Sequence, residues 1–255
     1  MSGFAEAALS RDAFLGGKLF LWQPKSGYRA GVDPILLAAS VDAEPGQEVL
    51  DLGCGAGAAA LALGTRIPGL RLTGLDMQPA YAALARRNAA AADQQMQVID
   101  GDIAAPPAEV RQMSFHHILA NPPYFDPNAR LAAADAGRER ALSEAVPLAE
   151  WVAFAARRLR PRGYLHMIQR SQRLPDLLVA AEGKLGSVEV LPLAARVGRS
   201  AEHILFRARK DGRAAFRIHF PKVLHTGARH TQDAEDYSRE IADVLRNGQK
   251  LCWPD

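Results

Sequence analysis

Val49-Leu50-Asp51-Leu52-Gly53-Cys54-Gly55-Ala56-Gly57 is a short apolar run that ends in three closely spaced glycines. Such a run predicts a buried strand leading into a tight turn, and the alanine-rich sequence after it predicts a helix. A glycine turn at this place lets the backbone approach a ligand closely. The spacing is G-x-G-x-G and not the G-x-G-x-x-G fingerprint that places a pyrophosphate on a helix N-terminus. The stretch therefore favours an α/β nucleotide-type site and counts against a dehydrogenase.

Acidic residues follow the next two predicted strands. Residues 71–75 lead into Asp76, about twenty residues beyond the glycines, where a carboxylate would reach ribose hydroxyls. Residues 96–99 lead into Asp100 and Asp102, and we expect Asp102 to face the exocyclic amine of a bound adenine. Taken singly, each of these aspartates is better explained as a solvated carboxylate at a strand end. Their ordered recurrence favours a binding site.

Asn121-Pro122-Pro123-Tyr124 follows the apolar residues 118–120, as if a buried strand ended in an exposed turn. An adenine amino group or a glutamine amide has a lone pair delocalised into its π-system, so a catalyst must draw it out by accepting hydrogen bonds from the N–H groups. The Asn121 side-chain carbonyl and the Pro122 backbone carbonyl are two such acceptors, and the prolines hold them still. The Tyr124 ring offers a base a stacking surface. The alternative is a proline-rich turn with no chemical role.

Taken together, these residues resemble the class I S-adenosylmethionine-dependent methyltransferases. The N-terminal stretch narrows the resemblance: Gly16-Gly17-Lys18-Leu19-Phe20, Gln23-Pro24-Lys25-Ser26-Gly27-Tyr28-Arg29-Ala30-Gly31-Val32-Asp33 and the apolar residues 35–39 are similar to the opening of the bacterial tRNA1(Val) adenine-37 N6-methyltransferase family. The resemblance covers nearly the whole chain and is weakest beyond Gly163. In the tail, residues 222–225 and 231–237 match the family only loosely.

The resemblance implies S-adenosyl-L-methionine as cofactor and an adenine in RNA, most naturally tRNA, as methyl acceptor. It implies that Asp51, Gly53 and Gly55 line the methionine end of the cofactor. Asp76 would bind its ribose and Asp102 its adenine, while Arg29 would pair with its carboxylate. The full implied cofactor set is Arg29, Gly31, Asp51, Gly53, Gly55, Asp76, Asp102 and Asn121. The implied catalytic set is Asn121, Pro122 and Tyr124.

Alternating strands and helices predict an α/β fold, with a doubly wound, mostly parallel, seven-stranded sheet and an antiparallel C-terminal strand. The predicted helices span residues 33–40, 56–66, 79–92, 146–159 and 172–181. Later strands are predicted at residues 164–168 and 188–191, after the sequence Arg160-Pro161-Arg162-Gly163. A hairpin of residues 204–209 and 214–220 is predicted around Asp211-Gly212. The alanine-rich residues 126–142 predict a substrate loop or a surface helix.

The 255 residues, 48% of them hydrophobic, can bury one large core. We predict a single domain made of an N-terminal cofactor lid and helix segment at 1–45, a Rossmann-like core at 46–210, and a hairpin strand with a tail at 211–255. No apolar run has membrane length and residues 1–10 carry no basic signal, so we predict a cytoplasmic protein. Two cysteines suit a reducing compartment. Scattered histidines predict no metal site.

Charge is unevenly distributed along the chain. Residues 1–150 carry 12 Lys and Arg against 17 Asp and Glu, whereas residues 151–255 carry 19 against 11, so their net charges are −5 and +8. A basic C-terminal half fits a polyanionic RNA partner, although a solvated edge hairpin would carry the same charges. Two other functions remain open. One is a protein-glutamine N5-methyltransferase of the release-factor type, because the Asn-Pro-Pro-Tyr motif indicates a planar nitrogen but not the molecule that carries it. The other is a non-catalytic RNA-binding module.

Overall fold

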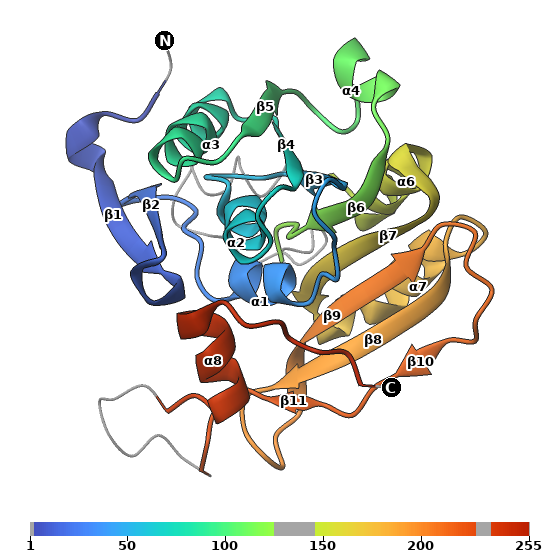
Figure 1. Cartoon of the computed structure of the whole chain (residues 1–255). Coiled ribbons are helices and arrows are strands. Elements are labelled where there is room, and N and C mark those ends of the chain that lie inside the picture. Colours follow the sequence, from blue (N-terminus) through green and yellow to red (C-terminus); the bar gives the residue numbers. More distant parts are fainter. Residues whose placement is uncertain (1–2, 125–145, 228–235, 255) are drawn as a thin grey trace, which may run out of the picture.

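A twisted sheet forms the centre of the computed structural model, which describes residues 3–124, 146–227 and 236–254 (Figure 1). Its long strands follow the order β8-β9-β7-β6-β3-β4-β5. Their bounds are Glu48–Leu52 (β3), Arg71–Asp76 (β4), Met96–Asp100 (β5), Phe115–Ala120 (β6), Leu159–Arg170 (β7), Gly186–Ala194 (β8) and Ala201–Arg209 (β9). All neighbouring pairs are parallel except those of β9, which runs antiparallel to both β7 and β8. This confirms the predicted doubly wound, mostly parallel sheet with its antiparallel C-terminal strand.

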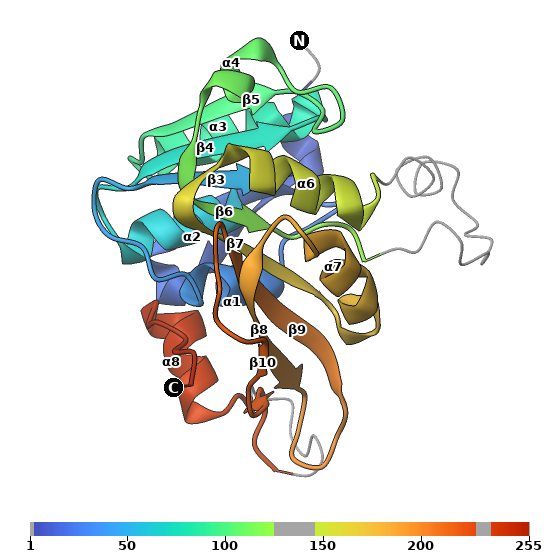
Figure 2. The same ribbon diagram turned by 90° about the vertical axis from the view of Figure 1, so that its right-hand side faces the viewer.

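Helices cover both faces of the sheet (Figures 1 and 2). Their bounds are Asp33–Ala39 (α1), Ala58–Arg66 (α2), Pro79–Ala91 (α3), Ala108–Gln112 (α4), Leu148–Arg158 (α6), Leu174–Ala181 (α7) and Arg239–Asn247 (α8). One core cluster joins the sheet to α1, α2 and α8, and a second joins it to α6 and α7. Because parallel strands between two helical layers are buried on both faces, β3 is buried at every position from Val49 to Leu52 rather than at alternate positions.

The first two strands, β1 (Leu9–Phe14) and β2 (Leu19–Pro24), form an antiparallel hairpin within the segment that was predicted as a lid and helix. Asn88 of α3 anchors it and is completely buried. Its Oδ1 accepts the N–H of Trp22 at 2.8 Å, and its Nδ2 donates to the carbonyls of Trp22 at 3.0 Å and Ala56 at 2.9 Å. One side chain therefore joins the hairpin to the start of α2.

The predicted hairpin of residues 204–209 and 214–220 is wrong. Strand β9 lies between β7 and β8, so it has no free edge on which a following strand could pair. The chain instead crosses to the far side of β8, where β10 (Arg217–Ile218) and β11 (Lys222–Val223) pair with it in parallel. Strand β10 lies within the predicted strand 214–220 but pairs with β8, and with β11 the described sheet has nine strands rather than the predicted seven.

Two other parts of the chain also differ from prediction. Residues 160–163 belong to β7, where an irregular register and a positive φ of 68° at Arg162 accommodate Pro161. The tail contains helix α8, whose Ile241 and Val244 pack in the core. Residues 126–142 lie outside the described residues. Within the described ranges, no helix is long and apolar enough to cross a membrane.

Candidate active site

The predicted site residues lie at one edge of the sheet. Strands β3, β4, β5 and β6 are parallel neighbours, so their carboxyl ends lie side by side. Leu52 pairs with Leu75 on one side and with Ala120 on the other, and Asp76 pairs with Asp100. The glycine turn, the acidic residues and the Asn-Pro-Pro-Tyr turn therefore emerge together, at the place where open α/β sheets bind ligands.

The glycine turn after β3 is fixed to the end of β4. The N–H groups of Gly53 and Cys54 both donate to the Leu75 carbonyl, at 2.8 and 3.0 Å, and the N–H of Gly55 donates to Asp76 Oδ2 at 2.8 Å. Gly53 has a φ of +70°, and a Cβ there would lie 2.6 Å from the Trp151 ring. Glycine is therefore required at this position both by the backbone and by the packing.

Two carboxylates are buried beside this turn. Asp51 is 3% exposed and accepts the N–H of Ala60 at 3.0 Å. Burial, together with the nearby charge of Asp76, raises the pKa of Asp51 to about 7. Asp76 is 7% exposed, and burial also raises its pKa, although it accepts N–H groups from Gly55 and Gln78. Each oxygen of Asp76 retains a lone pair for a further donor.

Asp100 and Asp102 have different surroundings at the end of β5. Asp100 pairs with Arg86 at 3.2 Å and its side chain is half exposed. Asp102 lies just beyond the strand and accepts the N–H of Ala104 at 2.9 Å, which fixes its side chain in a local turn. The choice of Asp102 over Asp100 as adenine ligand stays a prediction.

The Asn-Pro-Pro-Tyr turn is held by Tyr28 and by Asp33, the first residue of α1. Asn121 Nδ2 donates to the Tyr28 hydroxyl at 3.1 Å, and the Tyr124 hydroxyl donates to Asp33 Oδ2 at 2.6 Å. Pro122, between them, is buried. Burial and the Asp33 carboxylate raise the pKa of Tyr124, so its phenol remains a donor.

Tyr28 also spans the gap to the glycine turn, because a Cβ at Gly55 would lie 3.6 Å from its ring. The Tyr81 hydroxyl donates to the Tyr28 carbonyl at 3.0 Å. Next in sequence, Arg29 pairs with Asp12 of β1 at 2.7 Å and donates to the Pro24 carbonyl. The guanidinium of Arg29 is thus engaged with the hairpin, and its predicted contact with a cofactor carboxylate stays untested. Gly31 has open space where a side chain would stand.

Four contacts of the site were not predicted from sequence. Asp33 and Trp151 support the Tyr124 hydroxyl and the glycine turn. The Arg170 guanidinium lies 5.6 Å from the centre of the Tyr124 ring, and the His203 ring lies 5.3 Å from it. Asp33 stood in the N-terminal stretch that carried the family resemblance. His203 carried no local signal, because only the insertion of β9 beside β7 brings it to Tyr124.

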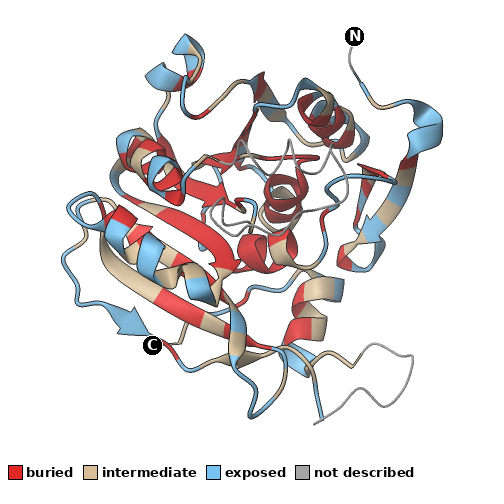
Figure 3. Ribbon diagram, turned by 180° about the vertical axis from the view of Figure 1, so that it is seen from behind, coloured by how far each residue is buried: buried red, intermediate tan, exposed pale blue. Residues whose placement is uncertain are grey.

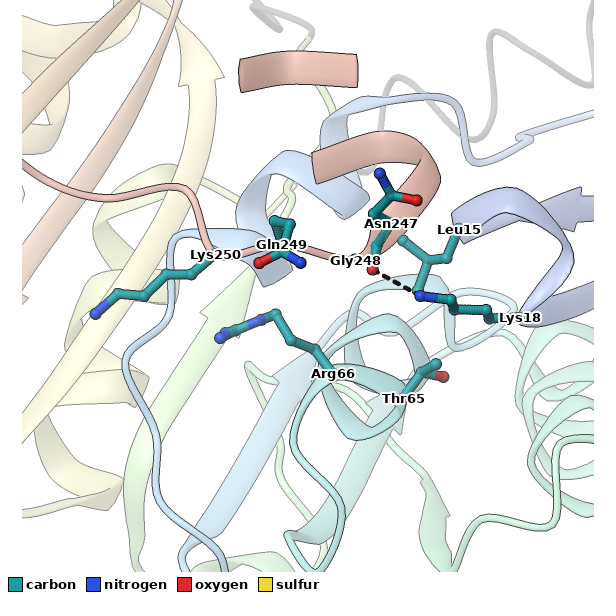
Figure 4. A pocket seen from close by; sticks show the side chains of 8 residues that line it. All are labelled: Leu15, Lys18, Thr65, Arg66, Asn247, Gly248, Gln249 and Lys250. Atoms are coloured by element: carbon teal, nitrogen blue, oxygen red, sulfur yellow. Dashed lines mark hydrogen bonds between the residues drawn. The ribbon is translucent and has the colours of Figure 1, made fainter. Parts of the chain in front are cut away.

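A pocket of about 430 Å³ lies away from these strand ends, between the last turns of α2 and α8 (Figure 4). Its cationic side chains have structural partners. Lys18 donates to the Asn247 carbonyl at 2.9 Å, and Arg66 donates to the carbonyls of Ala38 and Val41. These groups satisfy carbonyls at helix ends, so we assign the pocket a packing role.

Residues 31–193 match the family described as methyltransferase small domain. The chain belongs to this family. A tRNA1(Val) (adenine(37)-N6)-methyltransferase of Porphyromonas gingivalis is 32% identical to this methyltransferase over 223 residues, which cover 84% of this chain and 87% of that protein. A release factor glutamine methyltransferase of Vibrio cholerae is 42% identical over 82 residues, which cover 32% of this chain and 28% of that protein.

Solved structures share the fold of this chain. A predicted O-methyltransferase from Agrobacterium tumefaciens aligns with a TM-score of 0.69 at 24% identity, covering 86% of this chain and 98% of that chain. Other solved structures with this fold hold S-adenosylmethionine or S-adenosylhomocysteine. S-adenosylmethionine is the cofactor of this methyltransferase.

The residues at the strand ends fit that cofactor. Asp51 is a buried carboxylate with a raised pKa, and no basic side chain among the described residues pairs with it. A ligand that carries an ammonium and a sulfonium would supply the missing positive charge. Asp76 offers lone pairs to ribose hydroxyls beside the glycine turn, so the acceptors and the space match the cofactor chemically.

The raised pKa of Asp51 predicts a measurable dependence of stability on pH. Because the folded-state pKa of about 7 exceeds the ordinary 3.8, the charged form destabilises the folded protein above about pH 7, and this cost disappears as the pH falls toward 4. Asp51→Asn should therefore raise the free energy of unfolding of the cofactor-free protein at about pH 8, by up to roughly 4 kcal/mol, and much less at about pH 5.

Urea unfolding at the two pH values measures this difference. Glu44→Gln is the matched control, because Glu44 is exposed. It should change neither value by more than about 0.5 kcal/mol. An equal effect of Asp51→Asn at both pH values would contradict a buried, destabilising carboxylate.

Proposed function

We propose that this methyltransferase transfers a methyl group to the N6 amine of an adenine in RNA, with tRNA as the substrate class. The observation that carries the proposal is the hydrogen bond from Asn121 Nδ2 to the Tyr28 hydroxyl. It fixes the orientation of the amide, and Asn121 Oδ1, which accepts no hydrogen bond from the described residues, can accept one from an amine. The similarity to the Porphyromonas gingivalis enzyme over most of both chains supports tRNA adenine as the acceptor.

S-adenosylmethionine, when bound, supplies an electrophilic methyl group. Asp51, Gly53 and Gly55 would hold its methionine end, with positive charge beside the buried Asp51 carboxylate. Asp76 would accept hydrogen bonds from the ribose hydroxyls and Asp102 from the adenine amine. Arg29, Gly31 and Asn121 complete the proposed cofactor set, and Arg29 would reach the carboxylate only by leaving Asp12.

Asn121 Oδ1 and the Pro122 carbonyl would accept the two N–H hydrogens of the adenine amine. As positive charge develops on that nitrogen, both hydrogen bonds strengthen, which lowers the barrier. No strong base is needed, since the nitrogen becomes acidic after methylation and can lose its proton to water. Tyr28, which lies over Gly55, would exclude water from this space.

Tyr124 would stack the target base. Its hydroxyl is held by Asp33, so the ring has a fixed orientation before the base arrives. The nearby Arg170 and His203 offer positive charge and a hydrogen-bond donor for an adjoining phosphate. A base in a stem or a stacked loop would have to be turned out to reach the ring.

The basic stretch of the C-terminal half is not gathered at this site. Arg207 pairs with Glu189 and Lys222 with Glu240. Arg209 pairs across from Tyr164 in the middle of β7, whereas Arg170, at the carboxyl end of β7, pairs with His203 near Tyr124. Arg170 and His203 are therefore our proposed phosphate contacts beside the site, because the ion pair of Arg170 with Glu202 is long, at 3.5 Å, and exposed.

A protein-glutamine acceptor is the second candidate, because its amide nitrogen poses the same electronic problem and the Vibrio cholerae enzyme is similar over 82 residues. The two candidates are separated by the methyl acceptor. Incubation with methyl-labelled S-adenosylmethionine and separate RNA, DNA and protein fractions should label RNA, and digestion should yield N6-methyladenosine. Label recovered as N5-methylglutamine would replace the proposal with the second candidate, and RNA binding without any transfer would indicate a non-catalytic module.

Asn121→Ala should reduce the rate of methyl transfer about 10²-fold or more, by analogy with the loss of an oxyanion-hole donor. Cofactor affinity should change little. Tyr124→Phe keeps the stacking ring but loses the bond to Asp33, so it should lose less than Tyr124→Ala, which forfeits stacking worth about 1 to 3 kcal/mol. Single-turnover kinetics at saturating cofactor measure these rates, and an Asn121→Ala enzyme with the parent rate would remove Asn121 from the chemistry.

A further inference from the structure

An apolar stripe runs along the outer edge of the sheet at β10. Phe216, Ile218 and Phe220 are 46%, 60% and 83% exposed, although all three are large hydrophobic residues. They alternate with Arg217 and His219, as expected of side chains on one face of an extended segment. Figure 3 shows β10 as an exposed arrow beside the buried strands of the sheet. We call Phe216, Ile218 and Phe220 the edge stripe.

The segment is anchored from behind. The ring of His219, which is 8% exposed, contacts the Glu189 carboxylate at 2.7 Å. The backbone N–H of His219 donates to the Val190 carbonyl at 2.8 Å. Glu189 also pairs with Arg207 at 2.8 Å, and the Arg207 guanidinium lies 4.3 Å from the Trp253 ring centre. These contacts hold the backbone around β10 in place, so the side chains of the edge stripe face solvent in a fixed arrangement. A fixed apolar surface loses little conformational entropy when it binds a partner.

Positive charge surrounds the edge stripe. Arg213 and Arg217 are exposed, and neither forms an ion pair with a described residue. Asp211 is the one acidic residue between 207 and 222, a stretch that also holds Lys210. Two aromatic rings, with one such arginine between them and a second three residues before them, favour a partner that has flat apolar faces and negative charge.

We propose that the edge stripe is a stacking platform for unpaired nucleotides of the RNA substrate, an inference that rests on the proposed function. Phe216 and Phe220 offer ring faces to bases, which stack on aromatic side chains whatever their sequence. Arg213 and Arg217 pair with phosphates of the same strand. The ligand class is single-stranded RNA, such as a loop or an end.

The position of the stripe allows one RNA to reach both surfaces. Strand β10 lies four strand spacings from β6, or about 19 Å. Phe220 comes two residues before β11, which pairs with Leu193 and Ala194 at the carboxyl end of β8. The segment therefore leads toward the sheet edge where Tyr124 and His203 lie, across a span that a few nucleotides cover.

A second copy of this chain fits the stripe less well. Pairing of two β10 edges would bring Arg217 of each copy close to the other, and like charges on facing strands are destabilising. Strand β10 has only two residues, Arg217 and Ile218, so few backbone hydrogen bonds would offset that repulsion. An RNA strand would instead neutralise the charge of Arg217 with its negative phosphates.

The test uses the full chain and a fluorescent oligoadenylate of about 15 nucleotides, whose Kd is measured by anisotropy. The Phe216→Ala/Phe220→Ala variant should raise this Kd about tenfold or more, whereas Phe216→Tyr/Phe220→Tyr should stay within about twofold of the parent. Phe216→Leu/Phe220→Leu should resemble the alanine variant, because it keeps apolar area but not ring faces. Val179→Ala removes an equally exposed apolar side chain from α7 and should change nothing.

Thermal unfolding should be unchanged in all four variants, since the altered side chains are exposed. With the RNA substrate, the alanine variant should raise KM and leave kcat intact. Parent-like Kd in the alanine variant, or full binding by the leucine variant, would overturn stacking. Self-association of the parent that the alanine variant abolishes would assign the stripe to a second copy. Failure of the parent to methylate any RNA would refute the proposed function, whereas the stripe is judged on oligoadenylate binding alone.

Discussion

The hydrogen bonds between the glycine turn and the end of β4 are the constraint on which the site depends. The Leu75 carbonyl and the Asp76 carboxylate receive the N–H groups of Gly53, Cys54 and Gly55, so two adjacent strand ends set the path of one turn. The turn needs positive φ angles and has no room for a side chain at Gly53, against Trp151. This arrangement keeps Asp51 and Asp76 buried and close together, at a cost in stability that a cationic cofactor would relieve.

A second set of contacts joins the N-terminal segment to the catalytic turn. Asn88 fixes the hairpin to the core. Tyr28 and Asp33, which follow the hairpin in sequence, bind the side chains of Asn121 and Tyr124. The amide and the ring are therefore oriented by a part of the chain far from them in sequence. Preorganisation of this kind favours catalysis, because the acceptors need not reorganise when charge develops on the substrate.

Local patterns predicted the parallel core. They also predicted that the proposed site residues lie at one edge of the sheet, because glycines, aspartates and Asn-Pro-Pro-Tyr each follow a strand and parallel strands end together. The failures came from pairings that no local pattern encodes. The local pattern of residues 204–209 predicted half of a hairpin. These residues belong to β9, and β7 and β8 occupy both edges of that strand. Helix α8 is a different failure, because Ile241, Val244 and Leu245 follow helical spacing and Gly248 ends the helix with a φ of 68°, so a local pattern did encode it. The contact of His203 with Tyr124 depends on that same β9 insertion.

A crystal structure of the chain with S-adenosylhomocysteine and adenosine tests the central claim most directly, because it shows which atoms of Asn121 and Asp76 face the ligands. The account predicts both ribose hydroxyls within about 3 Å of Asp76, and Asn121 Oδ1 together with the Pro122 carbonyl within about 3 Å of the adenosine N6. The adenine should stack on Tyr124. An amide of Asn121 turned to present its nitrogen, or an adenosine bound with N6 away from both carbonyls, would contradict it.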